Sequence, residues 1–363
     1  MPLYNGVPFL ARSIDSILCQ SRRDFEFIIV DDGSTDGSDR VVHQFCDSRI
    51  RYFRKENGGY ASALNVALAH ARGEFIVNQD ADDISAPGRF ETMLRQFASP
   101  DVGFVHTDML LIDERDRPAG YWQGRNIEAR RLLRFLLKVG TPFNNTTYMA
   151  RREVLEGFSF DTELRFGEDT DMVAQVLDRW TTVHVPEPLY LYRRHSQNVS
   201  LNVPYEKMIN GPRKLLSRHT LRELVPELPW GEGEDEALAA RARAVVALLL
   251  FRRGFAPDAQ EWLNRAAETA ASRWFIEALY QLMAGRPEEC LRLLSGGEQD
   301  AVALHYAGEA LALLGDAGGA AQRFLAALAL NPDYSEPLDG LRALGARADM
   351  RTVDTTWSAL RPR

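Results

Sequence analysis

The sequence is poor in cysteine, has no long apolar run and carries no excess of positive charge. Its three cysteines, among 363 residues, are scattered and form no CxxC pair. This spacing argues against a disulfide framework or a cysteine-bound zinc ion, and it fits a reducing cytoplasm. The net charge of −8 disfavours a nucleic-acid binder, because contacts with phosphates need a basic surface.

No apolar run approaches the length of about 18 residues that a membrane-spanning helix needs. Polar residues also interrupt the N-terminal stretch where the apolar core of a signal peptide would stand. We therefore expect a cytoplasmic protein without a transmembrane segment, either free or peripheral at the inner face of a membrane. GxGxxG and GxxxxGK[ST] are absent, so neither a dinucleotide fold nor a P-loop has support.

Short runs rich in β-branched and aromatic residues alternate with segments of helical spacing near the N-terminus. We predict strands at 25–30, 50–53 and 74–77, and helices at 13–19, 39–45 and 61–71, the last with a C-cap at Gly73. This alternation is typical of a Rossmann-like, mostly parallel α/β sheet with flanking helices. Ligands bind such sheets beyond the carboxyl ends of the strands, where Asp31-Asp32 and residues 80–83 would lie.

The second half of the chain is rich in Ala, Leu and Arg and poor in β-branched residues, which favours helices. Gly254, Gly285 and Gly315 recur about thirty residues apart, and the last repeat fits the ~34-residue tetratricopeptide pattern. Its matching residues are Ala301, Gly308, Gly315, Ala320, Phe324, Ala327 and Pro332. We expect a helical connector and acidic linker at 206–236, tetratricopeptide-like helical repeats at 237–346 and a tail at 347–363.

Three acidic clusters are candidates for chemistry. Asp80-Ala81-Asp82-Asp83 places three carboxylates within four residues. Their repulsion would be relieved by Mg²⁺ or Mn²⁺, which prefer oxygen ligands and could hold a diphosphate. A solvated acidic turn with a helix cap explains the same residues equally well.

The other two clusters also admit two interpretations. Glu168-Asp169 could cap a helix through the helix dipole, or one carboxylate could remove the proton of an acceptor hydroxyl. Asp31-Asp32 could cap the next helix, or accept hydrogen bonds from a nucleobase or a ribose.

Taken in order along the chain, these motifs resemble glycosyltransferase family 2, whose catalytic domain has the GT-A fold. The matching residues are Pro2-Leu3-Tyr4-Asn5-Gly6, residues 31–36, Asn57, Gly59, Asn65, Asp80-Ala81-Asp82-Asp83, Pro87, Arg89, Glu168-Asp169, Tyr192-Arg193-Arg194-His195 and Ser200. The resemblance implies a GT-A glycosyltransferase domain at 1–205, followed by the helical repeats.

The resemblance also implies roles for the matching side chains. The implied residues for binding the nucleotide sugar are Pro2, Tyr4, Asp32, Asn57, Asp80, Arg193 and Arg194, the implied metal ligands are Asp82, Asp80, Asp83 and His195, and the implied general base is Asp169. Asp32 would accept the N3–H of a uracil base, and Asp82 would contact Mg²⁺ or Mn²⁺ directly. A structural role for His195 fits equally well, because the preceding segment resembles a core strand.

The implied reaction is inverting, metal-dependent transfer of a sugar from a nucleotide-diphosphate sugar, most simply a UDP-sugar. The acceptor would be a hydroxyl group in polysaccharide, glycolipid or glycoprotein synthesis, selected by residues 108–143 with Asn144-Asn145. Relatives place an apolar strand before the Pro2 motif, and Met1 stands where that strand would end. The resemblance therefore predicts a sheet without its first strand. Leu64 stands where many relatives carry Arg.

Other functions remain open. A catalytically inactive GT-A relic serving as a repeat-based interaction protein fits the absent strand, but the intact Asp32, Asp82 and Asp169 oppose it. A nucleotidyltransferase would also use paired carboxylates and a metal, but Asn5-Gly6-Val7-Pro8 is not its glycine-rich basic loop. The repeat tail is expected to bind a protein partner, to self-associate, or to cover apolar surface of the catalytic domain.

Overall fold

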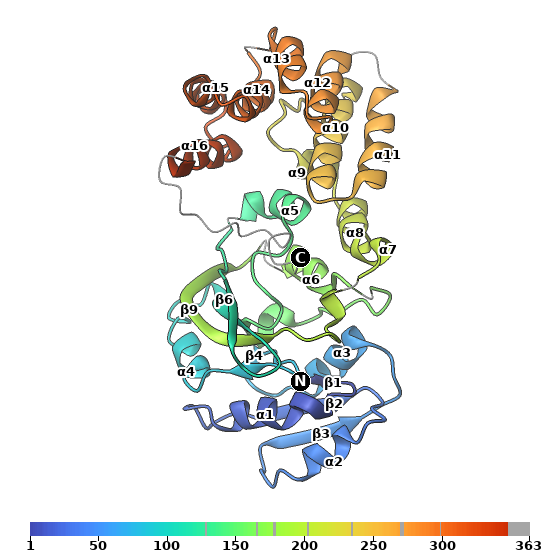
Figure 1. The fold of residues 1–363 in the computed structure, drawn as a ribbon, viewed down its shortest axis with the longest axis vertical. Coiled ribbons are helices and arrows are strands. Elements are labelled where there is room, and N and C mark those ends of the chain that lie inside the picture. The colour runs from blue at the N-terminus through green and yellow to red at the C-terminus, as the bar shows by residue number, and fades with distance from the viewer. Residues whose placement is uncertain are drawn as a thin grey trace. The chain divides into compact units, whose positions relative to one another are not determined.

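The computed structural model describes residues 1–127, 129–164, 166–176, 179–201, 203–233, 235–268, 272–297 and 299–347. The chain divides into two compact units. The first contains Met1–Leu132 and Gly140–Leu215, and the second contains Leu133–Val139 and the chain from Leu216 onward. The first unit is α/β and the second is helical, which confirms the predicted fold class (Figure 1).

The N-terminal motifs lie on a three-stranded parallel sheet of order β1-β2-β3. Its strands are β1 (Pro2–Leu3), β2 (Phe27–Asp31) and β3 (Ile50–Arg54), and its helices are α1 (Val7–Leu18), α2 (Ser38–His43) and α3 (Tyr60–His70). All five residues of β2 are buried, as expected for a central strand covered on both faces. The amphipathic helix α1 buries Leu10, Ile14 and Ile17 in the same core cluster as Ile29 of β2.

A second, mixed sheet has the order β4-β8-β6-β9-β5, with β7 paired to β6. Its strands are β4 (Phe75–Val77), β5 (Ile84–Ser85), β6 (Val102–Ile112), β7 (Pro118–Trp122), β8 (Tyr148–Arg151) and β9 (Thr181–Arg193). Strands β6 and β9 run parallel, and the other pairs are antiparallel. The accompanying helices are α4 (Arg89–Leu94), α5 (Ala129–Lys138), η1 (Arg152–Leu155), α6 (Glu168–Val176) and η2 (Val199–Leu201).

Strand β1 (Pro2–Leu3) lies within the Pro2 motif itself and pairs with β2. Its register pairs Pro2 with Val30. The amine of Met1 donates to the carbonyl of Ile28 at 2.8 Å, and burial lowers the pKa of that amine to about 5. A cavity of about 760 Å³ beside Met1 is lined by residues of both β2 and β4, including Ile28 and Phe75. Among the described residues, no strand pairs with both β2 and β4.

The predicted glycine C-cap after the 61–71 helix is wrong. Helix α3 ends at Ala71, whose ψ of 132° is extended, and Gly73 does not adopt a positive φ. The amides of Arg72 and Gly73 instead donate to Oε1 of Glu26, at 2.6 and 3.2 Å. The side chain of Glu26, the residue just before β2, therefore binds the backbone that follows this helix and leads into β4.

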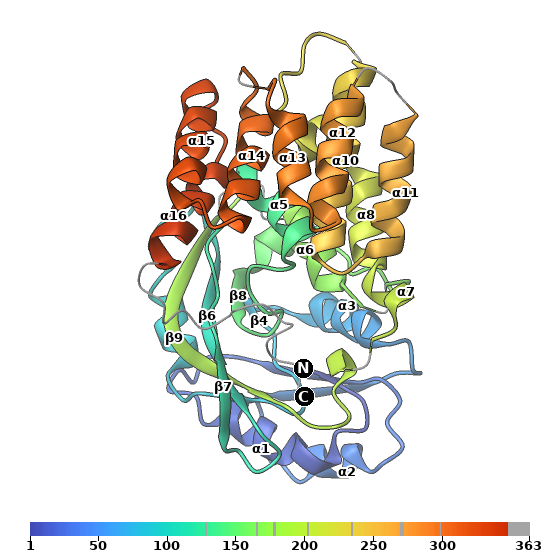
Figure 2. The same ribbon diagram turned by 45° about the horizontal axis from the view of Figure 1, so that its top comes forward.

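The second unit is helical in all its described elements and contains three successive helix pairs (Figure 2). Helix α7 (Tyr205–Met208) and most of α8 (Asn210–Arg218) still belong to the first unit. The second unit continues with α9 (Leu221–Leu224), α10 (Glu236–Arg252), α11 (Ala256–Ala267), α12 (Arg273–Met283), α13 (Pro287–Leu294), α14 (Ala301–Leu313), α15 (Ala317–Leu330) and α16 (Glu336–Arg347). The turn glycines Gly254, Gly285 and Gly315 have positive φ and separate the members of each pair. The tetratricopeptide assignment stays a prediction. No described helix combines the length and hydropathy that a bilayer span requires.

Gly308→Ala tests the packing of small residues between α14 and α15. A Cβ atom at Gly308 would lie 2.6 Å from the ring of Phe324. We expect the substitution to lower the free energy of unfolding by about 1–3 kcal/mol through overpacking. Gly318→Ala is the matched control, because its nearest neighbour would lie at 3.8 Å, and better helix propensity should stabilise it slightly. Urea unfolding followed by circular dichroism measures both variants, and equal stability of Gly308→Ala and wild type would contradict this packing.

Candidate active site

The segment after β1 is bonded to the segment after β2. The amide of Asn5 donates to Oγ of Ser34 at 3.0 Å, and Oδ1 of Asn5 accepts from the amide of Thr35 at 2.8 Å. The amide of Gly6 donates to Oγ of Ser38 at 2.9 Å. These bonds bring together two motifs that lie about thirty residues apart. Pro2 is buried within β1, and Tyr4 is 56% exposed beside it.

Asp32 follows β2 and is buried, and its carboxylate organises the loop before α3. Oδ1 accepts from Nζ of Lys55 at 2.6 Å and from the amide of Gly58 at 3.0 Å. Oδ2 accepts from the amide of Gly59 at 2.7 Å. Asn57 donates through Nδ2 to the backbone carbonyl of Asp32 at 3.0 Å. A carboxylate oxygen can accept two hydrogen bonds, so Oδ2 keeps an acceptor position for an incoming N–H group.

Lys55 was not predicted as a site residue. It follows directly after β3, so the cation stands at the same sheet edge as Asp32. A cation two residues beyond a predicted strand was the available signal. Sequence spacing alone did not distinguish it from a solvent-exposed lysine.

Tyr60 connects the Asp32 loop to the second acidic cluster. Tyr60 directly follows Gly59, and the amide of Gly59 donates to Asp32. The hydroxyl of Tyr60 donates to Oδ1 of Asp80 at 2.9 Å. The same hydroxyl accepts from Nδ2 of Asn78 at 2.8 Å and from Nδ2 of Asn145 at 3.3 Å. Burial, and then the charge of Asp80, raise the pKa of Tyr60. The phenol therefore stays neutral and keeps its proton directed at Asp80.

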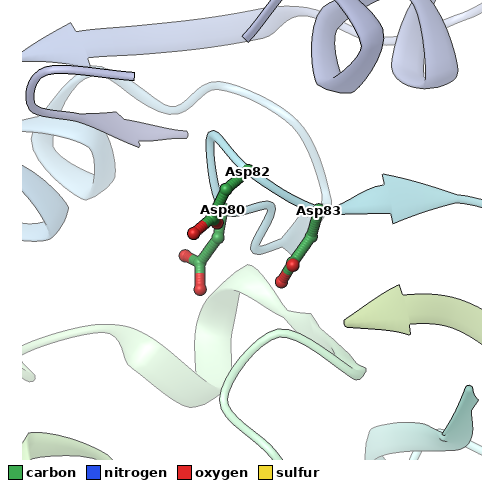
Figure 3. A group of neighbouring side chains, drawn as sticks. All are labelled: Asp80, Asp82 and Asp83. Carbon is green, nitrogen blue, oxygen red and sulfur yellow. The ribbon is translucent and has the colours of Figure 1, made fainter. Parts of the chain in front are cut away.

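The predicted cluster of Asp80, Asp82 and Asp83 is brought together in the loop after β4, with one ligand atom of each within 4.8 Å of the others (Figure 3). The carboxylates of Asp80 and Asp82 lie next to each other, whereas that of Asp83 lies to one side (Figure 3). Burial and the neighbouring charge of Asp82 raise the pKa of Asp80 to about 7. Ionising all of these carboxylates at once is therefore costly without a cation.

Asp83 is bonded to strand β9 through both carboxylate oxygens. Oδ2 accepts from the hydroxyl of Tyr190 at 2.8 Å, and Oδ1 accepts from the amide of Arg193 at 2.7 Å. Burial raises the pKa of Asp83, with further contributions from the charges of Asp82 and Asp80. These bonds give Asp83 a clear role in fixing the acidic loop against β9.

The Tyr192–His195 motif meets Asp82. Nε2 of His195 lies 2.8 Å from Oδ2 of Asp82, while Nδ1 accepts from the amide of Gln197 at 3.3 Å. An accepting Nδ1 places the proton on Nε2, which then donates to Asp82. Nε of Arg193 donates to the backbone carbonyl of Asp82 at 2.7 Å, and its guanidinium also pairs with Asp116 at 2.5 Å.

Arg194 takes part in this motif through its backbone. Its amide donates to the carbonyl of Ile112 at 2.8 Å, which fixes the backbone at the end of β9. Tyr192 and Ser200, the flanking members of the motif, share a hydrogen bond of 3.0 Å between their hydroxyl groups. The four consecutive residues therefore present one imidazole and one guanidinium at Asp82.

Glu168 and Asp169 begin helix α6. Oδ1 of Asp169 accepts from the amide of Thr170 at 2.7 Å, and Oδ2 lies 3.5 Å from Oγ1 of Thr141. Burial and the charge of Asp169 raise the pKa of Glu168 to about 8, and the charge of Asp80 adds to this shift. The start of α6 therefore lies within electrostatic reach of the loop after β4.

Hydrogen bonds connect the acid after β2 with the acids after β4, and the acids at the start of α6 are related to them through charge alone. Asp32 is joined to Asp80 through Gly59 and Tyr60, and the field of Asp80 acts on Glu168, which adjoins Asp169. The possible metal ligands around Asp80 and Asp82 are carboxylate oxygens and one imidazole nitrogen. This set of ligand atoms suits Mg²⁺ or Mn²⁺. The structure thus places the candidate nucleobase acceptor, the candidate cation ligands and the candidate general base in one α/β unit.

The stretch expected to select the acceptor is anchored to β6 by Asp108. Its oxygens accept from the hydroxyl of Tyr121, from the amide of Gly124 at 2.9 Å and from His184 at 2.7 Å. Tyr121 is 48% exposed, so its ring is available on the surface, although its hydroxyl is bonded. The anchor fixes the end of β7 and the start of the segment that leads to α5.

Known proteins resemble this chain in sequence. The model of the family "Glycosyl transferase family 2" matches residues 1–158. Glycosyltransferase GlyG of Streptococcus pneumoniae is 29% identical over 213 residues, which are 55% of this chain and 71% of GlyG. EpsE of Bacillus subtilis is 33% identical over 212 residues, which are 54% of this chain and 72% of EpsE.

One solved structure resembles the whole chain in fold. S. aureus TarS, residues 1–349, crystallised with UDP-GlcNAc, superimposes with a TM-score of 0.50 at 18% identity. The alignment covers 98% of this chain and 93% of the TarS fragment. At this identity the likeness concerns the fold, which is the GT-A architecture that the motifs implied.

Proposed function

Because this chain belongs to glycosyl transferase family 2, we propose that it transfers a sugar from a UDP-sugar to an acceptor hydroxyl with inversion at the anomeric carbon. The observation that carries the proposal is the linked set of acids after β2, after β4 and at the start of α6. A catalytically inactive relic would have no reason to keep these three groups connected.

Donor binding is proposed to start from Asp32. Its Oδ2 would accept the N3–H of the uracil base, with Pro2 and Tyr4 lining the base pocket and Asn57 holding the loop. TarS, which shares the fold, was crystallised with UDP-GlcNAc, so a UDP-sugar is the first donor to test. Arg193 and Arg194 would add positive charge near the diphosphate.

The cation site is proposed at Asp80 and Asp82, with Mg²⁺ or Mn²⁺ as the ion. Their adjacent carboxylates and the raised pKa of Asp80 fit a site that a divalent cation completes. His195 would become the adjoining nitrogen ligand once Nε2 gives up the proton that it donates to Asp82, and Asp83 would hold the loop from the side of β9. When bound, the ion neutralises the diphosphate and stabilises its departure.

Asp169 is proposed as the general base. It would take the proton of the acceptor hydroxyl as that oxygen forms its bond to the anomeric carbon and the bond from that carbon to the diphosphate breaks. Glu168 supports this assignment, because its pKa of about 8 keeps it protonated at pH 7 and leaves the negative charge to Asp169. The reaction needs no covalent intermediate.

The test is transfer from a panel of UDP-sugars to saccharide, lipid and protein acceptors, with Mn²⁺ and with EDTA. Hydrolysis of the donor in the absence of acceptor is measured in parallel, because it reports donor binding and activation without knowledge of the acceptor. The proposal expects turnover that EDTA abolishes. Calorimetry that detects no metal-dependent binding of UDP would favour the inactive relic.

Cation binding should depend on pH because Asp80 must lose its proton to become a ligand. With a pKa of about 7, Asp80 is mostly protonated at pH 6 and mostly ionised at pH 8, so acid competes with the cation. We expect Mn²⁺ to bind roughly tenfold more tightly at pH 8 than at pH 6. Titration calorimetry at the two pH values measures this ratio. Asp80→Asn should remove the dependence, and equal affinities in the wild type would contradict the assignment of Asp80.

A further inference from the structure

The turn between β6 and β7, residues 113–117, is held together by its own first residue. The amide of Asp113 donates to the carbonyl of Arg117 at 2.9 Å, and Oδ1 of Asp113 accepts from the amides of Arg115 and Arg117 at 2.8 and 3.0 Å. The amide of Asp116 donates to the carbonyl of Asp113 at 3.0 Å. The φ of Asp116 is 62°, in the left-handed region that aspartate tolerates better than most residues. The turn therefore closes without the carboxylate of Asp116.

That carboxylate pairs with arginines from two other elements of the same unit. Oδ2 pairs with Nη1 of Arg12 in α1, which lies beside the turn (Figure 2), and Oδ1 lies 2.5 Å from Nη1 of Arg193 at the end of β9. The side chain of Arg12 is 63% exposed, whereas that of Arg193 is 1% exposed. An exposed ion pair contributes little, but a buried guanidinium is costly unless opposite charge lies beside it. The pair with Arg193 is therefore the stronger constraint.

Arg193 joins this turn to the acidic loop after β4. Its Nη1 donates to the carbonyl of Asp113 at 3.0 Å, and its Nε donates to the carbonyl of Asp82 at 2.7 Å. Its backbone amide donates to Oδ1 of Asp83 at 2.7 Å. The guanidinium carbon lies 4.6 Å from the ring centroid of Phe9 in α1. One buried side chain thus holds the hairpin turn and the backbone of a candidate metal ligand at the same time.

The ring of Phe9 also lies against His195, with 5.0 Å between the ring centroids. His195 is the residue whose Nε2 meets Oδ2 of Asp82 at 2.8 Å. Both groups that contact Asp82 from β9 and the segment after it therefore pack on the same phenylalanine. A shift of the Arg193 guanidinium would disturb Asp82 directly through its carbonyl and indirectly through Phe9 and His195.

Charge acts in the same direction as geometry. The charges of Asp82 and Asp83 act on the guanidinium of Arg193, so these acids share its positive charge with Asp116. Without Asp116, they would balance more of that charge themselves. Acids that balance a buried arginine attract a divalent cation less strongly. The pair between Asp116 and Arg193 therefore leaves more negative charge for the cation.

We propose that Asp116 is a positioning residue for the cation site: it holds Arg193, and Arg193 holds the loop that carries Asp82. This inference rests on the cation site proposed at Asp80 and Asp82. Residues that hold metal ligands in place, without touching the metal, affect metal affinity by about 10- to 100-fold. Asp116 stands outside every motif that the sequence singled out, and all the residues of this network belong to the first unit.

The experiment is Asp116→Asn in the full chain. Asparagine keeps the size of the side chain and tolerates the left-handed backbone, so the turn should stay intact while the charge is lost. We expect Mn²⁺ to bind roughly tenfold more weakly in titration calorimetry. In the metal-free protein, amide hydrogen exchange should accelerate at residues 80–83 and 191–195. Saturating Mn²⁺ should restore most of kcat, whereas a general loss of structure would lower kcat at every Mn²⁺ concentration.

Two control variants remove neighbouring charges. Glu114→Gln takes one negative charge from an exposed position on the same turn, and Arg12→Ala removes the exposed partner of Asp116. Both should bind Mn²⁺ within about twofold of the wild type, since the pair with Arg193 stays intact. An equal loss of affinity in Glu114→Gln would show that only the overall charge of the turn matters. An equal loss in Arg12→Ala would show that Asp116 acts through α1. Either result would overturn the proposal.

A double variant tests whether Asp116 acts through Arg193. Arg193→Gln removes the buried guanidinium, and Asp116→Asn/Arg193→Gln should bind Mn²⁺ no more weakly than the weaker single variant, because both act through one contact. Multiplicative losses would contradict the proposal. Should Arg193→Gln fail to fold, the comparison of Asp116→Asn with its two controls still decides.

The measurements separate this inference from the proposed function. If the wild type binds Mn²⁺ but transfers no sugar, the proposed transfer fails, and weaker Mn²⁺ binding in Asp116→Asn still supports the role of Asp116. If the wild type binds no Mn²⁺, the cation site fails, and the inference about Asp116 fails with it. If the wild type is active and Asp116→Asn changes neither Mn²⁺ affinity nor exchange, Asp116 has no positioning role, while the glycosyltransferase activity stands.

Discussion

Asp169→Asn should lower kcat for sugar transfer by roughly a thousandfold, within the range that removal of a general base produces. Asparagine keeps the size of the side chain and an oxygen that accepts from the amide of Thr170, so the start of α6 should stay in place. Only the capacity to take the acceptor proton is lost. Binding of UDP and Mn²⁺, measured by calorimetry, should therefore match the wild type within about twofold.

Glu168→Gln is the matched control for that experiment. Glu168 is the adjacent residue, and its pKa of about 8 makes it a neutral side chain at pH 7, which glutamine imitates. We expect its kcat at pH 7 to stay close to that of the wild type. If Glu168→Gln were inactive and Asp169→Asn active, the general base would be Glu168, and the assignment made above would be wrong.

Asp82→Ala should weaken cation binding strongly and lower transfer by roughly a thousandfold, equivalent to about 4 kcal/mol of lost transition-state stabilisation. The substitution removes one of the two adjacent carboxylates and also the acceptor of the bond from Nε2 of His195. Because the remaining Asp80 loses the neighbouring charge that helps to raise its pKa, that pKa should fall toward its ordinary value. The pH dependence of any residual Mn²⁺ binding should shift to lower pH accordingly.

The control for Asp82→Ala is a substitution of another aspartate in the same unit, one that forms an ion pair with a residue close to it in the sequence. Asp47→Asn removes a carboxylate that pairs with Arg49 at 2.7 Å, and it should leave both Mn²⁺ affinity and kcat unchanged. Titration of Mn²⁺ with and without UDP distinguishes loss of the cation from loss of the nucleotide. Wild-type activity in Asp82→Ala would show that the acidic cluster is a structural turn.

Much of the N-terminal architecture follows from local pattern. The apolar run before Asp31 becomes the buried strand β2, and the small, apolar 61–71 segment becomes α3, each within about two residues of its predicted bounds. Asp32 follows β2 and Asp80 follows β4, the positions beyond strand ends that the alternation of strands and helices predicted. Local pattern failed at Gly73, where Glu26, distant in sequence, takes the place of a glycine cap.

The contacts that make a site are less visible in the sequence. Tyr60 could be read as a helix residue, yet its hydroxyl joins Asn78, Asn145 and Asp80. The ion pair between Asp116 and Arg193 joins two segments that stand far apart along the chain. The periodicity of a sequence gives information only about residues within one helix or strand. Contacts between residues far apart in the sequence can therefore be identified only from the folded structure.

The most direct test of the account is a crystal structure of the chain with UDP and Mn²⁺, using the anomalous signal of manganese. The account predicts an ion in contact with Asp82 and the diphosphate, the uracil base on Asp32, and Asp169 facing the opposite side of the sugar site. Manganese bound elsewhere, or a base seated away from Asp32, would contradict the claim that these three acids serve one reaction.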